Sequence, residues 1–575
     1  MSKNSFRLTS LFLILILPNF IYAQRLLLQE SVENSARYRW ENKPVLESIL
    51  LDNAELLSTW SHTDEGTMTL TTERAIDGIH SIRLSSNALV MQPTTVTDNN
   101  IYNRNSIFCS AKRVVSSQNW SNWNRVSMWI YPDYPGENAV SVYVRVMANS
   151  SSNDNIVLKN RQWNYIVSEI PTINRTSVTG IDIKFRLTGI EGGMNQNFTC
   201  DIDKVMLERV ATDKTSGWAV ATDKISFSHT GYSVGSKKSA FASNITATNF
   251  SLMNAVSNQT VFTKPIINQT TYRGLYQIMD FSEFNVPGSY FIQAGNIKTR
   301  PFSISPQVWL TPIEKALNFY YVLRCAYAVP GYHGVTNTDW RANGIDISGG
   351  WYDAGDLSQA LYNTSEGTLI LYQLAERLKQ NNTNSALLEK LTDEAKWGLQ
   401  WLLKVTDHAG KRAGWSVLGR WTDCIVGSAD DARASLTFNA TNFMLTAAAE
   451  AVAYRVLKDI DPTLAAKSLA MAEEDWGFAK AKLSTYLGST PACETAAAAT
   501  LASIELYKST GKQLYADQAL SMSSYLTDSQ QSTYIPGGEI AGFLYEKTDK
   551  AQILHSVYGS GAHEHTQIIA MAALC

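Results

Sequence analysis

The chain has 575 residues, with 49 basic and 52 acidic side chains and a formal net charge of −3. This near-neutral balance argues against a protein that binds nucleic acid or an anionic membrane through bulk charge. Hydrophobic residues make up 45% of the sequence and charged residues 18%, which is typical of a folded globular protein rather than a disordered one. At this length we expect three or four domains, each with its own core.

Residues 1–23 have the features of a cleavable secretory signal peptide. A basic start is followed by an apolar run from Leu11 to Tyr22, and the small residue Ala23 ends the segment. A transmembrane helix needs about 20 apolar residues, and this run is shorter and contains Pro18. We therefore predict export to the periplasm or the medium, and no membrane span in the mature protein.

Residues 24–212 show the two-residue period of half-buried β-strands. Val140, Val142, Val144 and Val146 alternate with polar or larger residues, and the stretch 181–187 does the same. Several such segments at short intervals predict an antiparallel β-sandwich.

The order of segments in this region resembles galactose-binding-like jelly rolls, a resemblance carried by residues 58–60, 77–84, 128–132 and 201–207. Such domains often bind carbohydrate. Trp120, Trp123 and Trp163 are then either platforms for sugar rings or parts of the sandwich core.

The six cysteines are widely scattered, and none forms a CxxC pair, so zinc ligation has no spacing to support it. Within the first domain, Cys109 and Cys200 fit either a disulfide, which an exported protein permits, or two buried free thiols. We expect no metal site on these grounds.

A second β region spans residues 218–305, after a short polar linker. Gly231-Tyr232, the stretch 237–240 and the stretch 280–290 resemble the Ig-like module that precedes some cellulase catalytic domains. The resemblance implies a structural role, in which the module braces the enzyme.

From residue 307 to residue 575 the period becomes helical. Leu371, Leu374, Ala375 and Leu378 recur at helical spacing, and Ala-rich helices are expected over 440–457, 463–484 and 494–528. We predict about seven helices, the beginning of another at 563–575 and no strands, which is most simply an antiparallel helical array.

Between the first two of these helices lies the sequence Gly-Gly-Trp-Tyr-Asp-Ala-Gly-Asp, residues 349–356. Asp353 and Asp356 are three residues apart around a flexible Ala-Gly, so a turn brings both carboxylates together. Two close carboxylates can hold a water molecule, one activating it and the other orienting it. Trp351 and Tyr352 add aromatic faces for a substrate. The alternative is a cation-binding or merely capped loop.

This motif follows a helix containing residues 319–325 and an Ig-like module, and in that order it resembles glycoside hydrolase family 9 over residues 218–575. The resemblance implies an (α/α)6 barrel that hydrolyses β-1,4-glucans with inversion, without a cofactor but with room for a structural Ca²⁺. It assigns the general base to Asp356 and the positioning of the water to Asp353. Leu357-Ser358-Gln359 stands where a lysine commonly follows, which leaves substrate preference open.

The resemblance also implies a general acid, a glutamate in an Asn-Glu sequence near the end of the barrel. No Asn-Glu occurs in the helical region, and roughly 265 residues are too few for twelve barrel helices. We therefore expect the barrel to be incomplete, the chain to be truncated at its C-terminus and its own turnover to be negligible. Glu494, Glu539 and Glu564 are carboxylates without a setting that nominates one as a replacement.

Further candidates each have a plainer interpretation. Trp415, Trp421 and His333 are either substrate contacts or packing residues, and Asp430-Asp431 is either a cation site or a solvated turn. His563 and His565 diverge by about 200° on a helix, so a shared metal is not expected.

Two functions remain. The leading one is a secreted, monomeric glycoside hydrolase of the endo-β-1,4-glucanase type that degrades polysaccharide. The other is a non-catalytic carbohydrate-binding protein that retains the sandwich and has lost the activity of the barrel. Within the enzyme class, xyloglucan, mixed-linkage glucan and glucosamine polymers stay open as substrates.

Overall fold

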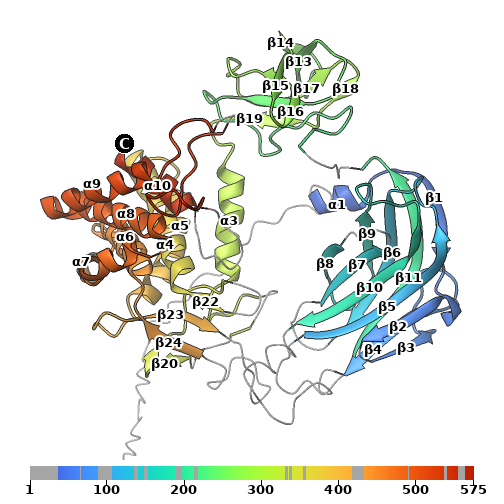
Figure 1. The fold of residues 1–575 in the computed structure, drawn as a ribbon, viewed down its shortest axis with the longest axis horizontal. Coiled ribbons are helices and arrows are strands. Elements are labelled where there is room, and N and C mark those ends of the chain that lie inside the picture. The colour runs from blue at the N-terminus through green and yellow to red at the C-terminus, as the bar shows by residue number, and fades with distance from the viewer. Residues whose placement is uncertain are drawn as a thin grey trace, which may run out of the picture.

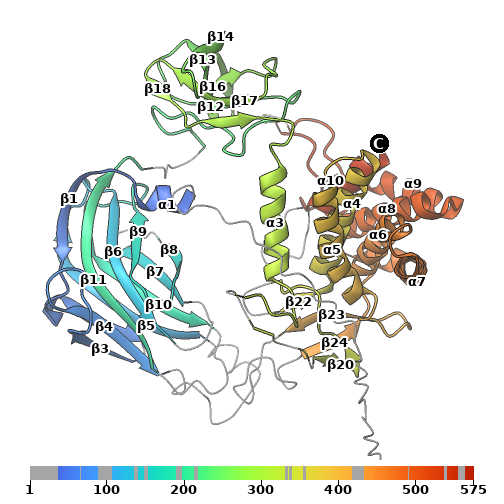
Figure 2. The same cartoon turned by 180° about the vertical axis from the view of Figure 1, so that it is seen from behind.

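The computed structural model describes residues 36–575 except 65, 88–105, 135–139, 148–152, 189–196, 213–217, 331–333, 336–337, 339, 354–357, 418–432, 490, 536–539 and 555–563. In Figure 1 a β-sandwich lies on the right, a smaller β-domain at the top and a group of helices on the left. Figure 2 shows the same three parts from behind. Strands thus make up the two N-terminal regions and helices dominate the third, as the sequence predicts, although the third region also contains short strands.

The first domain consists of two antiparallel sheets. One has the order β3-β4-β11-β6-β9, with β1 also paired to β11, and the other has the order β2-β5-β10-β7-β8. A short helix, α1 (Ala36–Glu41), precedes the first strand. The strands are β1 (Val45–Asp52), β2 (Trp60–Asp64), β3 (Thr67–Thr71), β4 (Ser81–Asn87), β5 (Ser106–Gln118), β6 (Arg125–Asp133), β7 (Val140–Met147), β8 (Asn153–Leu158), β9 (Asn164–Glu169), β10 (Val178–Thr188) and β11 (Asn197–Val210).

The alternation in the sequence sets the core of this sandwich. Val142, Val144 and Val146 of β7 have no exposed surface, and Ile181 and Ile183 of β10 are equally buried. Of the three tryptophans considered as sugar platforms, Trp120 is 2% exposed and Trp123 packs against the core, so both have the packing role. Cys109 and Cys200 are both buried and are not joined in a disulfide, so the second of the two interpretations applies.

The second domain is also a sandwich of two antiparallel sheets, with the orders β12-β16-β15 and β14-β13-β17-β18, and β19 pairs with β17. Its core is aromatic, with Phe302 packed against both Tyr232 and Phe281. The strands are β12 (Ser239–Ala242), β13 (Asn249–Asn254), β14 (Thr260–Pro265), β15 (Ile267–Thr271), β16 (Gly274–Asp280), β17 (Gly288–Ala294), β18 (Ile297–Lys298) and β19 (Phe302–Ile304).

The helical region separates into inner and outer helices. Fifteen of the 18 residues of α6 (Ala440–Leu457) and 15 of the 19 residues of α8 (Ala492–Thr510) are buried, against seven of the 26 of α7 (Pro462–Leu487). A helix buried all round belongs to the inside of the domain. The remaining helices are α3 (Leu310–Val322), α4 (Leu361–Gln380), α5 (Ser385–Leu402), α9 (Gln513–Asp528) and α10 (Glu564–Leu574).

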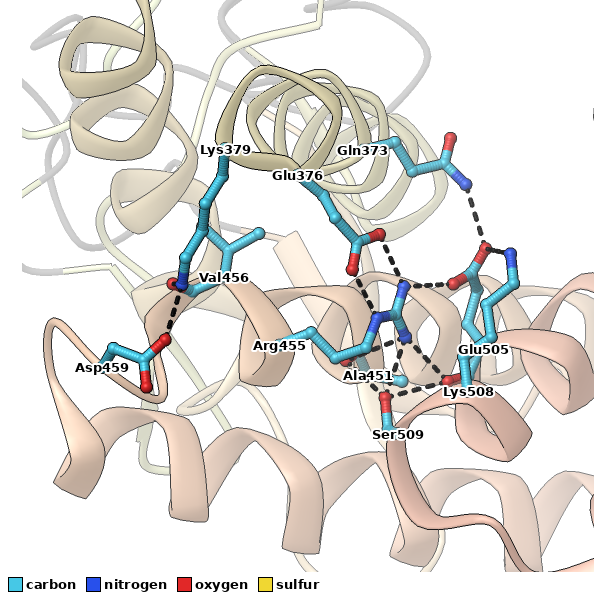
Figure 3. Close-up of polar contacts among 10 residues, drawn as sticks. All are labelled: Gln373, Glu376, Lys379, Ala451, Arg455, Val456, Asp459, Glu505, Lys508 and Ser509. Atoms are coloured by element: carbon cyan, nitrogen blue, oxygen red, sulfur yellow. Dashed lines mark hydrogen bonds and ion pairs between the residues drawn. The ribbon is translucent and has the colours of Figure 1, made fainter. Parts of the chain in front are cut away.

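Side-chain contacts show that α4, α6 and α8 run parallel and that α10 begins beside the start of α4. Near their N-terminal ends, the Tyr362 hydroxyl bonds Thr566 at 2.8 Å and Thr441 bonds Thr495 at 2.8 Å. At the opposite ends, Arg455 of α6 contacts Glu376 of α4 at 2.6 Å and also bonds Glu505 of α8 (Figure 3). The four helices therefore present their N-terminal ends on one side of the domain.

The expectation that this region lacks strands is wrong. Its described part contains β20 (Arg341–Ala342), β21 (Ile345–Asp346), β22 (Gln359–Ala360), β23 (Arg412–Val417) and β24 (Arg433–Thr437). These strands are too short, or too polar, to give a period in the sequence. They pair as β20-β21 and β22-β23-β24, and the second sheet links the chain before α4 to the chain before α6.

None of the helices in the described ranges combines the length and apolarity that crossing a membrane requires.

Candidate active site

The loop before α4 depends on two glycines in the left-handed region of φ. Gly349 has φ +88° and Gly350 has φ +68°, conformations that cost other residues energy. A Cβ on Gly350 would also lie 2.9 Å from the ring of Trp401. The loop is held to the end of α3 because the Tyr352 amide donates to the Leu323 carbonyl at 2.8 Å.

Trp351 and Tyr352 lie inside the protein rather than in an open cleft. They are 4% and 3% exposed, and the indole Nε1 of Trp351 donates to Glu394 at 2.9 Å. Glu394 is itself fully buried and pairs with Arg324 at 3.0 Å. The expectation that these two residues offer ring faces to a substrate does not fit this geometry, because both rings are buried. Their packing holds the loop in place instead. The Arg324–Glu394 pair was not anticipated, since 70 residues separate its members.

The ring of Trp351 leaves no room for a side chain at Gly398 of α5. A Cβ at this position would lie 2.4 Å from the indole and 2.3 Å from the Thr368 hydroxyl. Gly398→Ala is expected to destabilise the protein by about 1–3 kcal/mol, because forced overpacking outweighs the gain in helix propensity. Chemical denaturation followed by tryptophan fluorescence measures the change.

Gly477→Ala is the matched control for that substitution. Gly477 lies within α7, and a Cβ there would meet nothing within 4 Å. This variant should be more stable than the parent by about 0.5–1 kcal/mol. Equal effects at the two positions would show that Trp351 is not packed as described.

Asp353 is the described member of the aspartate pair. Its backbone amide donates to the Ser358 carbonyl at 2.8 Å, and the Ser358 hydroxyl donates to its Oδ1. The Asn363 side chain donates to its Oδ2 at 3.4 Å. Ser358 precedes β22 and Asn363 lies in the first turn of α4, and together they fix the orientation of the carboxylate. Asp356 lies outside the described residues.

Trp415 lies at the same end of the domain. It pairs in register with Ala360, the N-cap residue of α4, and its side chain is 59% exposed. Of the aromatic residues expected to contact substrate, Trp415 is thus the one whose ring is open to solvent in the described part of the chain. Trp421 and His333 lie outside the described residues.

A group of titratable side chains surrounds the start of α8. Glu494 is 5% exposed, and burial, together with the nearby Glu366, raises its pKa to about 8. Glu366 of α4 pairs with His565 of α10. Burial also raises the pKa of Tyr362. Glu494 is therefore protonated at neutral pH.

The side chains of the remaining candidates from the sequence are outside the described part of the chain. Asp430-Asp431, Glu539 and His563 lie outside the described residues, as does the side chain of Glu564. Among the residues that are described, no group of three or more His, Cys, Asp or Glu is placed to hold a metal ion. Ser358, Asn363 and Glu366 were missed in the sequence because their role depends on the position of the first turns of α4.

Comparison with known proteins identifies the two C-terminal regions. Residues 311–572 match "Glycosyl hydrolase family 9", and residues 220–299 match "Cellulase N-terminal ig-like domain". The helical region belongs to glycosyl hydrolase family 9. The family of the helical region and the preceding Ig-like module, both expected from the resemblance, are confirmed.

Three curated relatives are similar to parts of the chain. Endoglucanase C of Cellulomonas fimi is 28% identical over 42% of this chain and 27% of its own length. Endoglucanase A of Bacillus pumilus is 27% identical over 32% and 30%, and a cellulose 1,4-beta-cellobiosidase of Acetivibrio thermocellus is 25% identical over 43% and 36%. The chain thus spans between 27% and 36% of the length of these relatives.

Two solved structures are also similar. A metagenome-derived glycoside hydrolase family 9 endoglucanase has 23% identity and a TM-score of 0.43, with 52% of this chain and 64% of that chain covered. A Bacteroides ovatus family 9 protein has 18% identity and a TM-score of 0.42, with 61% and 71% covered.

Proposed function

We propose that this protein is a secreted hydrolase that cleaves β-1,4-glucan chains with inversion of configuration, using Asp356 as general base and Asp353 to orient the attacking water. The observation that carries the proposal is the family 9 match over residues 311–572, which includes the aspartate loop. That loop precedes α4 directly, at the side of the domain where the inner helices begin.

The described geometry is consistent with this chemistry. A carboxylate that orients water must itself be held still, and Asp353 receives hydrogen bonds from Ser358 and Asn363. The N-terminal ends of helices carry a partial positive charge that favours carboxylates in their ionised, proton-accepting form. Trp415, which pairs with Ala360 at the start of α4, has an exposed ring that offers a flat apolar face suited to a pyranose ring.

Inversion also requires a general acid about 6.5–9.5 Å from the base, so that a water molecule fits between the base and the sugar. The reaction then needs no covalent intermediate and no cofactor. Proton transfer to the base and from the acid occur in one step, and the anomeric carbon changes configuration.

The test is a product analysis of the full-length protein by proton NMR. With cello-oligosaccharides and soluble β-1,4-glucan, the first product detected should be the α-anomer, which later equilibrates with the β-anomer. Xyloglucan, mixed-linkage glucan and chitosan, tested in parallel, define the substrate preference. A first product in the β-configuration would contradict inversion. Binding without any hydrolysis would favour the non-catalytic alternative.

We also propose that residues 1–23 direct export and are removed. The order of a basic start, an apolar run and a small residue is that of a signal peptide. N-terminal sequencing of the secreted protein should begin at Gln24. A secreted protein that begins at Met1 would contradict this.

A further inference from the structure

A groove on the N-terminal sandwich has the chemistry of a second carbohydrate site. It lies between α1 and the strands β6 and β9, and its volume is about 740 Å³, within the usual range for small-molecule sites. No function assigned to the helical region uses this groove.

The groove opens on the face of the sheet that points away from the core. Met128 and Ile130 of β6 are buried in the core, so Trp129 between them points to the opposite face. Trp129 is paired in register with Tyr165 of β9, and their ring centroids are 5.2 Å apart. Both rings, with that of Trp163, line the groove and are partly exposed. Trp129 and Tyr165 form an aromatic wall, and Trp163 lines the same groove, with its ring against that of Tyr131.

The charged groups of the groove are largely neutralised by partners. Arg125 donates to Glu208 at 2.6 Å, and Lys43 pairs with Glu169. On α1, Arg37 pairs with Glu41 at 2.6 Å.

Polar groups remain at the floor and the rim. The Tyr165 hydroxyl donates to Glu208 at 3.2 Å, and the exposed side chains of Asn42, Lys159 and Gln162 offer hydrogen-bonding groups at the edge. An aromatic wall with paired charges and polar groups at the rim suits a ligand that is uncharged, has apolar ring faces and carries hydroxyl groups at its edges.

We propose that this groove binds a segment of neutral β-glucan chain, with sugar rings packed on Trp129, Tyr165 and Trp163. The choice of β-glucan among neutral polysaccharides rests on the proposed function of the helical region. The groove would hold the polymer beside the catalytic domain and would act chiefly on long substrates.

Affinity electrophoresis of the full chain in gels containing hydroxyethylcellulose tests the proposal. Trp129→Ala should raise the dissociation constant obtained from the retardation at least tenfold, because one ring of the Trp129–Tyr165 pair is lost. Trp218→Ala is the matched control, because Trp218 is 66% exposed and lies in the second β region, outside the groove. It should bind as the parent does.

Tyr165→Phe is a conservative change in the same groove, since it keeps the ring and removes only the hydroxyl, which contacts Glu208 and Ser127. It should retain binding within a few-fold, and circular dichroism should show all variants folded. Equal retardation of Trp129→Ala and Trp218→Ala would overturn the proposal, as would a preference for anionic polygalacturonate.

Measurements of hydrolysis distinguish a failure of the groove proposal from a failure of the proposed function of the helical region. Trp129→Ala should leave kcat on cellotetraose unchanged, while its rate on polymer falls. A parent protein that is retarded by glucan but hydrolyses nothing would contradict the proposed function and leave the groove supported.

Discussion

Asp356→Asn is expected to lower kcat on soluble β-glucan by about 10²- to 10⁴-fold in the full-length protein, which is the contribution of a general base. The substitution keeps the size and hydrogen-bonding shape of the side chain and removes its ability to accept a proton from water. Substrate binding and folding should therefore be retained. Initial rates of reducing-sugar release, with KM determined separately, measure the effect.

Asp353→Asn and Asp459→Asn complete this comparison. Asp353→Asn should also reduce kcat, because the water loses one of its two anchors, although Ser358 and Asn363 can still hold the amide in place. Asp459 lies near the C-terminal end of α6, beside Lys379 (Figure 3), and its substitution should leave kcat unchanged.

Azide provides a further criterion for the base. A small anion attacks without needing to lose a proton, so azide should partly restore the rate of Asp356→Asn. Azide should not change the rate of Asp459→Asn. Full activity of Asp356→Asn without azide would contradict the assignment of the base.

Most of the fold follows from local patterns in the sequence. The alternation at 140–146 and 181–187 became β7 and β10, and the helix expected over 440–457 is α6 with the same bounds. These elements bury one face or their whole surface, so the identity of each residue reflects its position. The strands β22, β23 and β24 were missed because their pairing is set by long-range contacts rather than by a period of their own.

The site was predictable only in part. The aspartates and the two glycines stand in one short segment, so their chemistry is visible in the sequence. The roles of Trp351 and Tyr352 were not, since whether a ring faces a cleft or the core depends on α5, where Gly398 makes room for the indole. The environment of Glu494 likewise depends on Glu366, 128 positions away in the sequence.

Glu494→Gln is expected to make the helical region more stable at pH 8.5 than the parent and nearly equal to it at pH 4.5. The pKa of Glu494 is raised from 4.5 to about 8 in the folded protein. Between these two values the unfolded chain releases the proton and the folded protein retains it, so the parent loses stability as the pH rises. Below pH 4.5 both states are protonated and no penalty exists.

The size of this effect follows from the same linkage. A tenfold difference in proton affinity is worth about 1.4 kcal/mol, so a pKa raised from 4.5 to about 8 gives a full penalty in the parent on the order of 5 kcal/mol above pH 8. Glutamine cannot ionise and keeps the neutral shape of the buried acid, so the variant escapes the penalty. Urea unfolding at several pH values, followed by far-UV circular dichroism, measures the difference between the two proteins.

Glu389→Gln is the control for this pH dependence. Glu389 lies on α5 with its side chain exposed to solvent, so the same chemical change there removes no buried carboxyl. Its stability should follow that of the parent at every pH. If the curve of Glu494→Gln ran parallel to that of the parent as well, Glu494 would be ionised within the fold. The start of α8 would then have to supply a partner for its charge, because a buried carboxylate without one is too costly to persist.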